Sequence, residues 1–147
     1  TTRTASAAMA ATINRIKPTN RYTHLYTNSN STGSASINEA PICNNLAVDP
    51  ATTGVEPFSI TFTVNGSDSD GTISKVNFNF GDGGISGDIT TTGGIGTNSV
   101  NVATSHTYNN AGEYTASAVI TDNNGDVSSS TSCQQTIIVQ AGNGGGG

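Results

Sequence analysis

The amino-acid sequence predicts an all-β fold: a sandwich of seven short strands that follows an extended N-terminal arm. Only 10% of the 147 residues are charged and 33% are hydrophobic, whereas Thr, Ser, Asn and Gly fill most of the other positions. A helical bundle usually needs more Leu, Glu and Lys than this. Thr-rich segments that are broken by Gly and Asn favour short strands and tight turns instead. Because the chain has no Trp, we expect a core of Val, Ile, Phe and Tyr.

Residues 1–40 are predicted to form the arm, and its first part has a helical pattern. Ala5, Met9, Ile13 and Ile16 recur at helical spacing, so they would share one face of a helix between Ala5 and Ile16. A helix of about twelve residues is marginal in water on its own. We therefore expect it to need a partner that covers this apolar face.

The second part of the arm alternates like a strand. Over residues 22–27, Tyr22 and Tyr26 would lie on one face and Leu25 on the other. A polar linker rich in Ser and Asn follows at residues 28–36. Since so few apolar residues are present, this region is not expected to form a core of its own.

The sandwich is expected over residues 41–140, where clusters of Gly, Asn and Asp separate apolar segments. In the clearest segment, Phe58, Ile60, Phe62 and Val64 alternate with polar residues, as in a strand with one buried face. The seven predicted strands span residues 45–48, 58–64, 73–80, 88–92, 99–104, 113–121 and 134–140, and a flexible Gly-rich tail is expected at 141–147.

Charge is distributed unevenly along the chain, whose net charge is −5. Four of the five cationic residues and one acidic residue lie in residues 1–40, which gives the arm +3 and leaves −8 for residues 41–147. The arm and the domain are therefore expected to attract each other; the alternative is a solvated tail whose charge has no role. An acidic domain disfavours nucleic acid as a partner, because it repels phosphates. No apolar run of about 18 residues occurs, so the sequence predicts no membrane span.

Three short motifs carry a family resemblance. They are residues 78–83 (Phe-Asn-Phe-Gly-Asp-Gly), 106–108 (His-Thr-Tyr) and 112–114 (Gly-Glu-Tyr). Together they resemble the PKD (polycystic kidney disease) domain family, whose fold is an immunoglobulin-like β-sandwich. The resemblance extends over about residues 41–140 and departs from the family pattern at Phe78, where Trp is usual. It implies a seven-stranded, PKD-type sandwich.

The resemblance also implies roles for the motif residues. In this family such residues organise the core and its loops, and we expect this of Phe78, Phe80, Asp82, His106, Tyr108 and Tyr114. The ring of Tyr108 should be buried, with its hydroxyl bonded to a backbone group. No pair of nucleophile and base is recognisable, since His24 belongs to the arm and His106 lies beside a turn. The chain is therefore not expected to be an enzyme.

The two cysteines, Cys43 and Cys133, lie at the start of the predicted domain and just before its last strand. In an immunoglobulin-like sandwich the first and last strands are commonly close, so the resemblance implies a disulfide. Closing a loop of about 90 residues would stabilise the fold by roughly 4 kcal/mol and would indicate an oxidising compartment. Two unrelated buried thiols are the alternative.

One metal ion is suggested by the resemblance. Some PKD-like domains bind calcium near the loop that matches residues 68–71, and Asp68 and Asp70 offer the oxygen ligands that calcium prefers, with Asn65 or Ser67 as further donors. In the alternative, these aspartates accept hydrogen bonds from their own backbone amides in a turn. No other cofactor is predicted.

These features predict an extracellular or cell-surface structural protein. The first hypothesis is a subunit that assembles with copies of itself into a filament or surface layer, its arm docking on neighbouring domains. The arm residues expected to make that contact are Met9, Ile13, Ile16, Tyr22, Leu25 and Tyr26. The alternative is a non-catalytic spacer or adhesion module of a larger secreted hydrolase or adhesin. Glycan binding is disfavoured, because the chain has no Trp and its four Phe are expected in the core.

Overall fold

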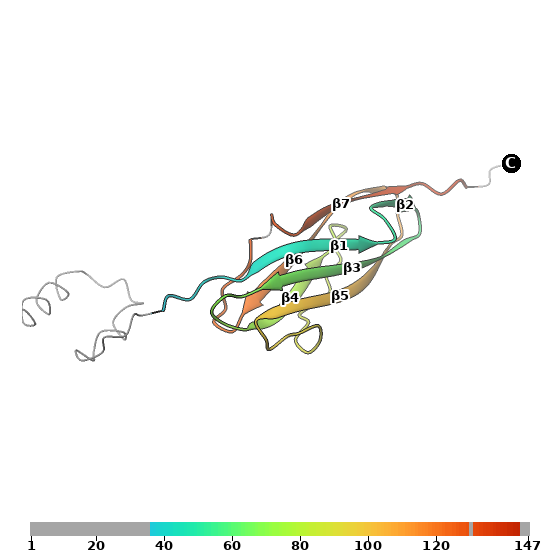
Figure 1. Ribbon diagram of the computed structural model, residues 1–147. Helices are drawn as coiled ribbons and strands as arrows, with labels where there is room; N and C mark the ends of the chain where they lie inside the picture. The colour runs from blue at the N-terminus through green and yellow to red at the C-terminus, as the bar shows by residue number, and fades with distance from the viewer. Residues whose placement is uncertain (1–35, 130, 145–147) are drawn as a thin grey trace, which may run out of the picture. The chain divides into compact units, whose positions relative to one another are not determined.

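The computed structural model describes residues 36–129 and 131–144, which form seven β-strands and no helix. The strands are β1 (Ile42–Asp49), β2 (Thr53–Val55), β3 (Phe58–Ser67), β4 (Ile73–Asn79), β5 (Ser99–Tyr108), β6 (Gly112–Asp122) and β7 (Gln134–Gln140). They form two sheets with the orders β1-β3-β5 and β2-β7-β6-β4 (Figure 1). Neighbouring strands are antiparallel except β2 and β7, which run parallel. The predicted all-β sandwich is confirmed, whereas the helix and strand expected before residue 36 lie outside the described residues.

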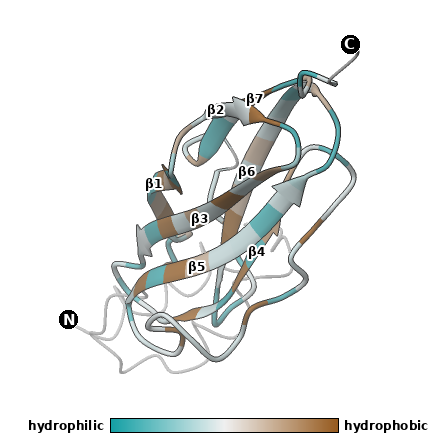
Figure 2. Ribbon diagram, turned by 90° about the vertical axis from the view of Figure 1, so that its right-hand side faces the viewer, coloured by the Kyte–Doolittle hydropathy of each residue, from teal (hydrophilic) through white to brown (hydrophobic). Residues whose placement is uncertain are grey.

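The core lies between the two sheets and follows the two-residue period of the strands. In β3, Ile60, Phe62 and Val64 are buried, and Phe78 of β4 and Ile120 of β6 are buried opposite them. Figure 2 shows hydrophobic and polar residues following one another along the strands. Among the described residues, none forms a helix long and apolar enough to cross a membrane.

Residues 88–92, predicted to be a strand, do not form one. They belong to the long loop between β4 and β5, in which Ile89 makes an isolated bridge with Val76 of β4. The N–H of Val76 donates to the carbonyl of Ile89 at 3.0 Å, and the N–H of Ile89 returns a bond of 2.8 Å. Ile89 also packs against the core, partly buried. Its apolar side chain, which suggested a strand, therefore anchors the loop on the core, while its backbone covers the outer edge of β4.

The alternation pattern does not predict β2, a strand of three residues with Gly54 at its centre. The ring of Phe58 occupies the space that a side chain at position 54 would need, so glycine is required there and the alternation is lost. β5 is longer than predicted and continues to Tyr108. His106 therefore belongs to a strand.

The chain enters and leaves the sandwich at opposite ends. β1 and β7 run in the same direction, because Cys43 near the start of β1 is bonded to Cys133 just before β7, and Leu46 further along β1 accepts a hydrogen bond from Gln135 of β7. Figure 1 shows both strands running in the same direction, toward the C-terminus. We call the end at which β1 and β7 begin the N-terminal end, and the end at which both finish the C-terminal end.

Candidate functional site

At the C-terminal end, the glycine-rich turn after β4 approaches the backbone of β6 closely. Gly81 has a positive φ of 83°, and a Cβ atom at this position would lie 2.8 Å from the amide nitrogen of Thr115. Only glycine combines that conformation with that space at low cost. The next residue, Asp82, accepts a bond of 2.9 Å from the N–H of Gly84. The turn thereby fixes the position of the Asp82 carboxylate.

Asp82 is hydrogen-bonded to His106 across this end of the sandwich. Its Oδ2 atom lies 2.7 Å from Nε2 of His106, and the two side chains are only 23% and 20% exposed. Burial alone would raise the pKa of Asp82, but the hydrogen bonds from His106 and from the N–H of Gly84 hold it below its ordinary value. The imidazole also stacks on Phe80, with ring centres 4.0 Å apart and an interplanar angle of 3°.

Tyr108 lies beneath this pair and is fully buried. Its hydroxyl donates to the carbonyl of Phe80 at 2.8 Å, as predicted, and its ring contacts the edge of His106 and stacks on Tyr114. Burial raises the pKa of Tyr108, and the charge of Asp82 raises it further. Tyr108 is therefore a neutral hydrogen-bond donor that ties β5 to the turn after β4.

This cluster offers no recognisable catalytic machinery in the described residues. The side-chain hydrogen bond of His106 goes to Asp82, and no described Ser, Thr or Cys side chain bonds to the imidazole. A nucleophile that acts with a His–Asp pair must lie within hydrogen-bond reach of the histidine. The geometry thus fits the structural role expected of these motif residues.

At the N-terminal end, carboxylates hold the turns and the segment that leads into β1. Asp68 is buried, and its Oδ1 atom accepts bonds from the N–H groups of Asp70 and Gly71 at 3.2 and 3.1 Å. The carboxylate of Asp70 in turn accepts from the N–H of Glu39 at 3.1 Å. The turn that was the alternative to a calcium site is therefore present.

The nearby Asp122 was not expected as a site residue, although it is only 1% exposed. Its Oδ1 atom accepts from the N–H groups of Asn124 and Asp126, and its Oδ2 atom accepts from Nδ2 of Asn38 at 2.8 Å. Burial would raise the pKa of Asp122, but the bond from Asn38 and the backbone bonds lower it overall. Asn38 and Asp122 are 84 residues apart, so no local pattern in the sequence could have paired them.

Calcium usually takes six to eight oxygen ligands, so Asp68 and Asp70 alone would not complete its coordination. In the described part of the chain, no three His, Cys, Asp or Glu side chains are placed to hold a metal ion. Among the described residues, the Oδ2 atom of Asp68 is buried without a hydrogen-bond partner. Calcium binding by Asp68 and Asp70 stays a prediction.

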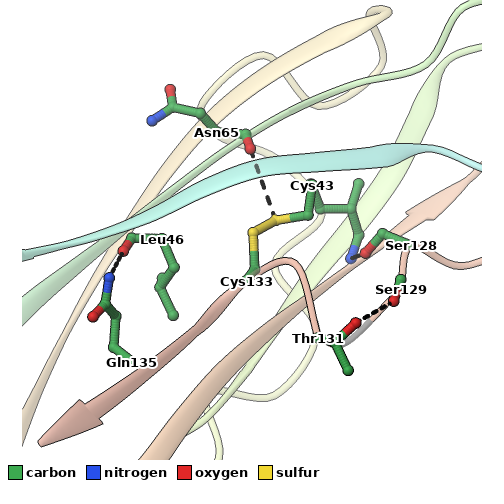
Figure 3. Close-up of a disulfide and its surroundings, with 9 residues drawn as sticks. Cys43, Leu46, Asn65, Ser128, Ser129, Thr131, Cys133 and Gln135 are labelled. Carbon is green, nitrogen blue, oxygen red and sulfur yellow. Dashed lines mark hydrogen bonds between the residues drawn. A yellow bond between two sulfur atoms is a disulfide. The ribbon is translucent and has the colours of Figure 1, made fainter.

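The predicted disulfide is present and joins the two sheets (Figure 3). The Cα atoms of Cys43 and Cys133 are 6.0 Å apart, and both residues are buried. Beside them, Nε2 of Gln135 donates to the carbonyl of Leu46 at 2.7 Å. A second, polar contact therefore links β1 to β7 next to the covalent one.

A family model described as PKD domain matches residues 38–138. The chain belongs to the PKD domain family. PKD domains are commonly modules of secreted proteins and are generally non-catalytic. The described fold agrees with this membership, and the disulfide is consistent with an oxidising environment.

Solved structures of PKD domains are similar to the described fold. One is the PKD domain of an M14-like peptidase from Thermoplasmatales archaeon SCGC AB-540-F20 (22% identity, 70% of this chain and 98% of that chain, TM-score 0.55). Another is the PKD1 domain of Vibrio anguillarum Epp (24% identity, 72% and 100%, TM-score 0.50). A further similar structure comes from work on the promiscuous specificity of carbohydrate-binding modules from the β-sandwich superfamily (30% identity, 72% of this chain and 36% of that chain, TM-score 0.52). No curated protein matches the sequence.

Proposed function

We propose that this chain is a non-catalytic structural subunit of an extracellular assembly, in which the PKD domain is a link placed end to end between its neighbours. The observation that carries the proposal is the parallel course of β1 and β7, through which the chain enters at one end of the sandwich and leaves at the other. Such a module connects its two neighbours along the long direction of its strands.

Both ends of the domain are anchored in a way that suits a link under tension. At the N-terminal end, the leading segment is held by the bonds from Asn38 to Asp122 and from Glu39 to Asp70. At the C-terminal end, the N–H of Glu56 donates to the carbonyl of Gln140 at 3.0 Å. Between them, the disulfide connects the first strand directly to the last.

Self-assembly through residues 1–40 is the finer part of the proposal. Every one of the ten acidic residues lies after residue 38, while four of the five cationic residues lie before residue 22. The N-terminal end of the domain carries Glu39, Asp70 and Asp126 on exposed positions, so it suits a basic segment from a neighbouring copy. Repeated docking of this kind produces a filament when the rotation between copies does not close.

Electron microscopy of the native protein beside a chain that lacks residues 1–35 tests this proposal. The deletion stops before Asn38, so it preserves the bond from Asn38 to Asp122. We expect filaments or sheets that disappear on deletion, while the melting temperature of the domain stays unchanged. Single particles in both samples would refute assembly through the arm.

The second candidate is a passive spacer or adhesion module of a larger secreted hydrolase or adhesin. It is favoured by the similar PKD domains, which belong to an M14-like peptidase and to Vibrio anguillarum Epp. Glycan binding is less well supported, because the aromatic rings of the described residues are committed to the core: Phe62, Phe78, Phe80 and Tyr108 are buried, and Phe58 and Tyr114 pack against them. Two observations together would favour this second function: the protein forms monodisperse particles, and a hydrolase domain lies next to it in the same polypeptide.

A further inference from the structure

Two sheets present four outer strand edges, and three of these are protected in the described structure. β2 is only three residues long. The edge of β1 has a register shift between Cys43 and Asn45, and the carbonyl of Leu46 on it is capped by Gln135. Short edges, bulges and side-chain caps are the devices by which proteins prevent unwanted strand pairing.

The edge of β4 is covered by the loop that follows it. Val76 exchanges two backbone bonds with Ile89, and the carbonyl of Phe78 accepts from the N–H of Ser86 at 2.9 Å. At the start of the strand, Ile73 donates to Thr97 at 2.8 Å. This loop takes the place of a further strand along β4.

The edge of β5 is different, because its second half lacks such a cover. The N–H of Asn101 points away from β3 and donates to the carbonyl of Gly93 at 2.7 Å. Backbone groups of an antiparallel strand alternate in direction, so those of Ala103, Ser105 and Thr107 also point away from β3. Among the described residues, no backbone bond reaches these three from that side.

Nothing in the sequence of β5 protects this free edge. β5 pairs with β3 over ten residues without a register shift, and it contains no Pro, Lys, Asp or Glu. Its outward side chains are small and uncharged, and they join a row of hydroxyls with β3: Thr107 bonds to Ser59 at 2.8 Å and Ser105 to Thr61 at 3.1 Å. A neighbouring strand can therefore approach closely.

We propose that β5 pairs antiparallel with β5 of a second copy of this chain, in a two-fold contact centred on Ser105. In this register, Ala103 lies opposite the partner's Thr107 and Ser105 lies opposite its symmetry mate, so all three outward residues of each copy gain backbone partners. The two three-stranded sheets then join into one continuous sheet.

The lack of charge at this edge distinguishes it as a place where a second copy of an acidic chain can bind. The chain has a net charge of −5, so two copies repel each other over most orientations. The outward residues of β3 and β5 carry no charge, which makes this edge a place where identical chains meet without opposing carboxylates. This inference rests on the proposed self-assembly and names one surface for it.

Two lysine variants of the full-length chain test the contact. Ala103 and Thr63 are direct partners in the β3–β5 register, so Ala103→Lys and Thr63→Lys add the same charge to the same face of the sheet. Only Ala103→Lys places that charge at the free edge. In sedimentation experiments, we expect Ala103→Lys to weaken self-association by about tenfold and Thr63→Lys to leave it nearly unchanged. Equal effects of both variants, or a monomeric wild type at high concentration, would overturn the proposal.

Cysteine cross-linking supplies an independent measurement. Opposite residues of a hydrogen-bonded antiparallel pair have Cα atoms about 5.5 Å apart, within the range that a disulfide spans. Ser105→Cys should therefore form an intermolecular disulfide under mild oxidation, and Thr61→Cys, one strand further in, should not. Cross-linking at both positions would contradict the register.

The same variants separate this inference from the proposed function. If the chain lacking residues 1–35 loses its filaments but still forms the cross-link at Ser105→Cys, the β5 contact is independent of the arm. If filaments persist in Ala103→Lys and no cross-link forms, the β5 contact is wrong while assembly through the arm stands. If Ala103→Lys weakens self-association only while residues 1–35 are present, the arm binds the edge of β5 in place of a second β5, and our proposal is wrong.

Discussion

Cys43 and Cys133 are separated by 90 residues in the sequence, yet their bond joins the beginning of β1 to the beginning of β7. The shortest covalent path through the domain therefore runs along the leading segment, across the disulfide and out through β7. Tension applied to the two ends follows this path. The residues between the two cysteines, which form most of the sandwich, are excluded from it.

Force spectroscopy should reveal this bypass. When the oxidised domain is pulled from both ends, we expect it to lengthen only by the few residues outside the disulfide loop. After reduction, or in a chain with both cysteines replaced by serine, unfolding should release about 300 Å of additional contour length. The variant without cysteines should respond identically with and without reductant. A release of about 300 Å from the oxidised protein would contradict the proposed path.

The hydroxyl of Tyr108 is predicted to be more important for stability than that of Tyr114. Both donate to a backbone carbonyl at 2.8 Å, but the bond from Tyr108 to Phe80 is buried and the bond from Tyr114 to Asn110 is exposed. Tyr108→Phe leaves a buried carbonyl without its donor, which should cost about 1–3 kcal/mol in the free energy of unfolding. Tyr114→Phe is the matched control and should cost clearly less, because the exposed carbonyl of Asn110 can accept a hydrogen bond from water instead. Chemical denaturation of the two variants measures the difference; equal losses would contradict the importance of burial.

The features of the fold and of the candidate site that the sequence predicts are local ones. The alternation from Phe58 to Val64 identifies β3 because one face of that strand is buried throughout. The motif resemblance identifies the cluster of Phe80, His106 and Tyr108, since its residues carry a family pattern.

The remainder depends on contacts between distant segments. Asn38 meets Asp122 across 84 residues, and no periodicity marks either residue. Ile89 looks like part of a strand because it is apolar, but its role is to seal the edge of β4 from a loop. β2 is held by its register with β7, and its central Gly54 breaks the alternation by which a strand is recognised. In each case the tertiary contact determines the local structure.

Calcium should have little effect on stability if Asp68 serves only its turn. An asparagine at this position keeps an oxygen that accepts from the N–H groups of Asp70 and Gly71, so Asp68→Asn is expected to preserve the turn. A role of Asp68 in the turn alone predicts equal melting temperatures with calcium and with a chelator, in the wild type and in this variant. A calcium-dependent rise in the wild type that disappears in Asp68→Asn would instead establish the metal site, with the partnerless Oδ2 atom as one ligand.

The pairing of Asn38 with Asp122 predicts that the domain loses stability in acid. The folded pKa of Asp122 lies below its ordinary value of about 4, so the carboxylate contributes stability that is fully present above pH 4 and is lost as the pH falls through the folded pKa. Asp122→Asn should therefore lower the free energy of unfolding by about 1–3 kcal/mol at pH 7. The gap to the wild type should close at low pH.

Urea denaturation of the wild type and Asp122→Asn between pH 7 and pH 2 measures this closing gap. Asp49→Asn, at the exposed end of β1, is a control that removes one carboxylate without a buried network. Asn38→Ala removes the partner instead, so it should reproduce part of the loss at pH 7. A constant difference between Asp122→Asn and the wild type at all pH values would show that the variant perturbs packing, and that the charge of Asp122 does not stabilise the N-terminal end.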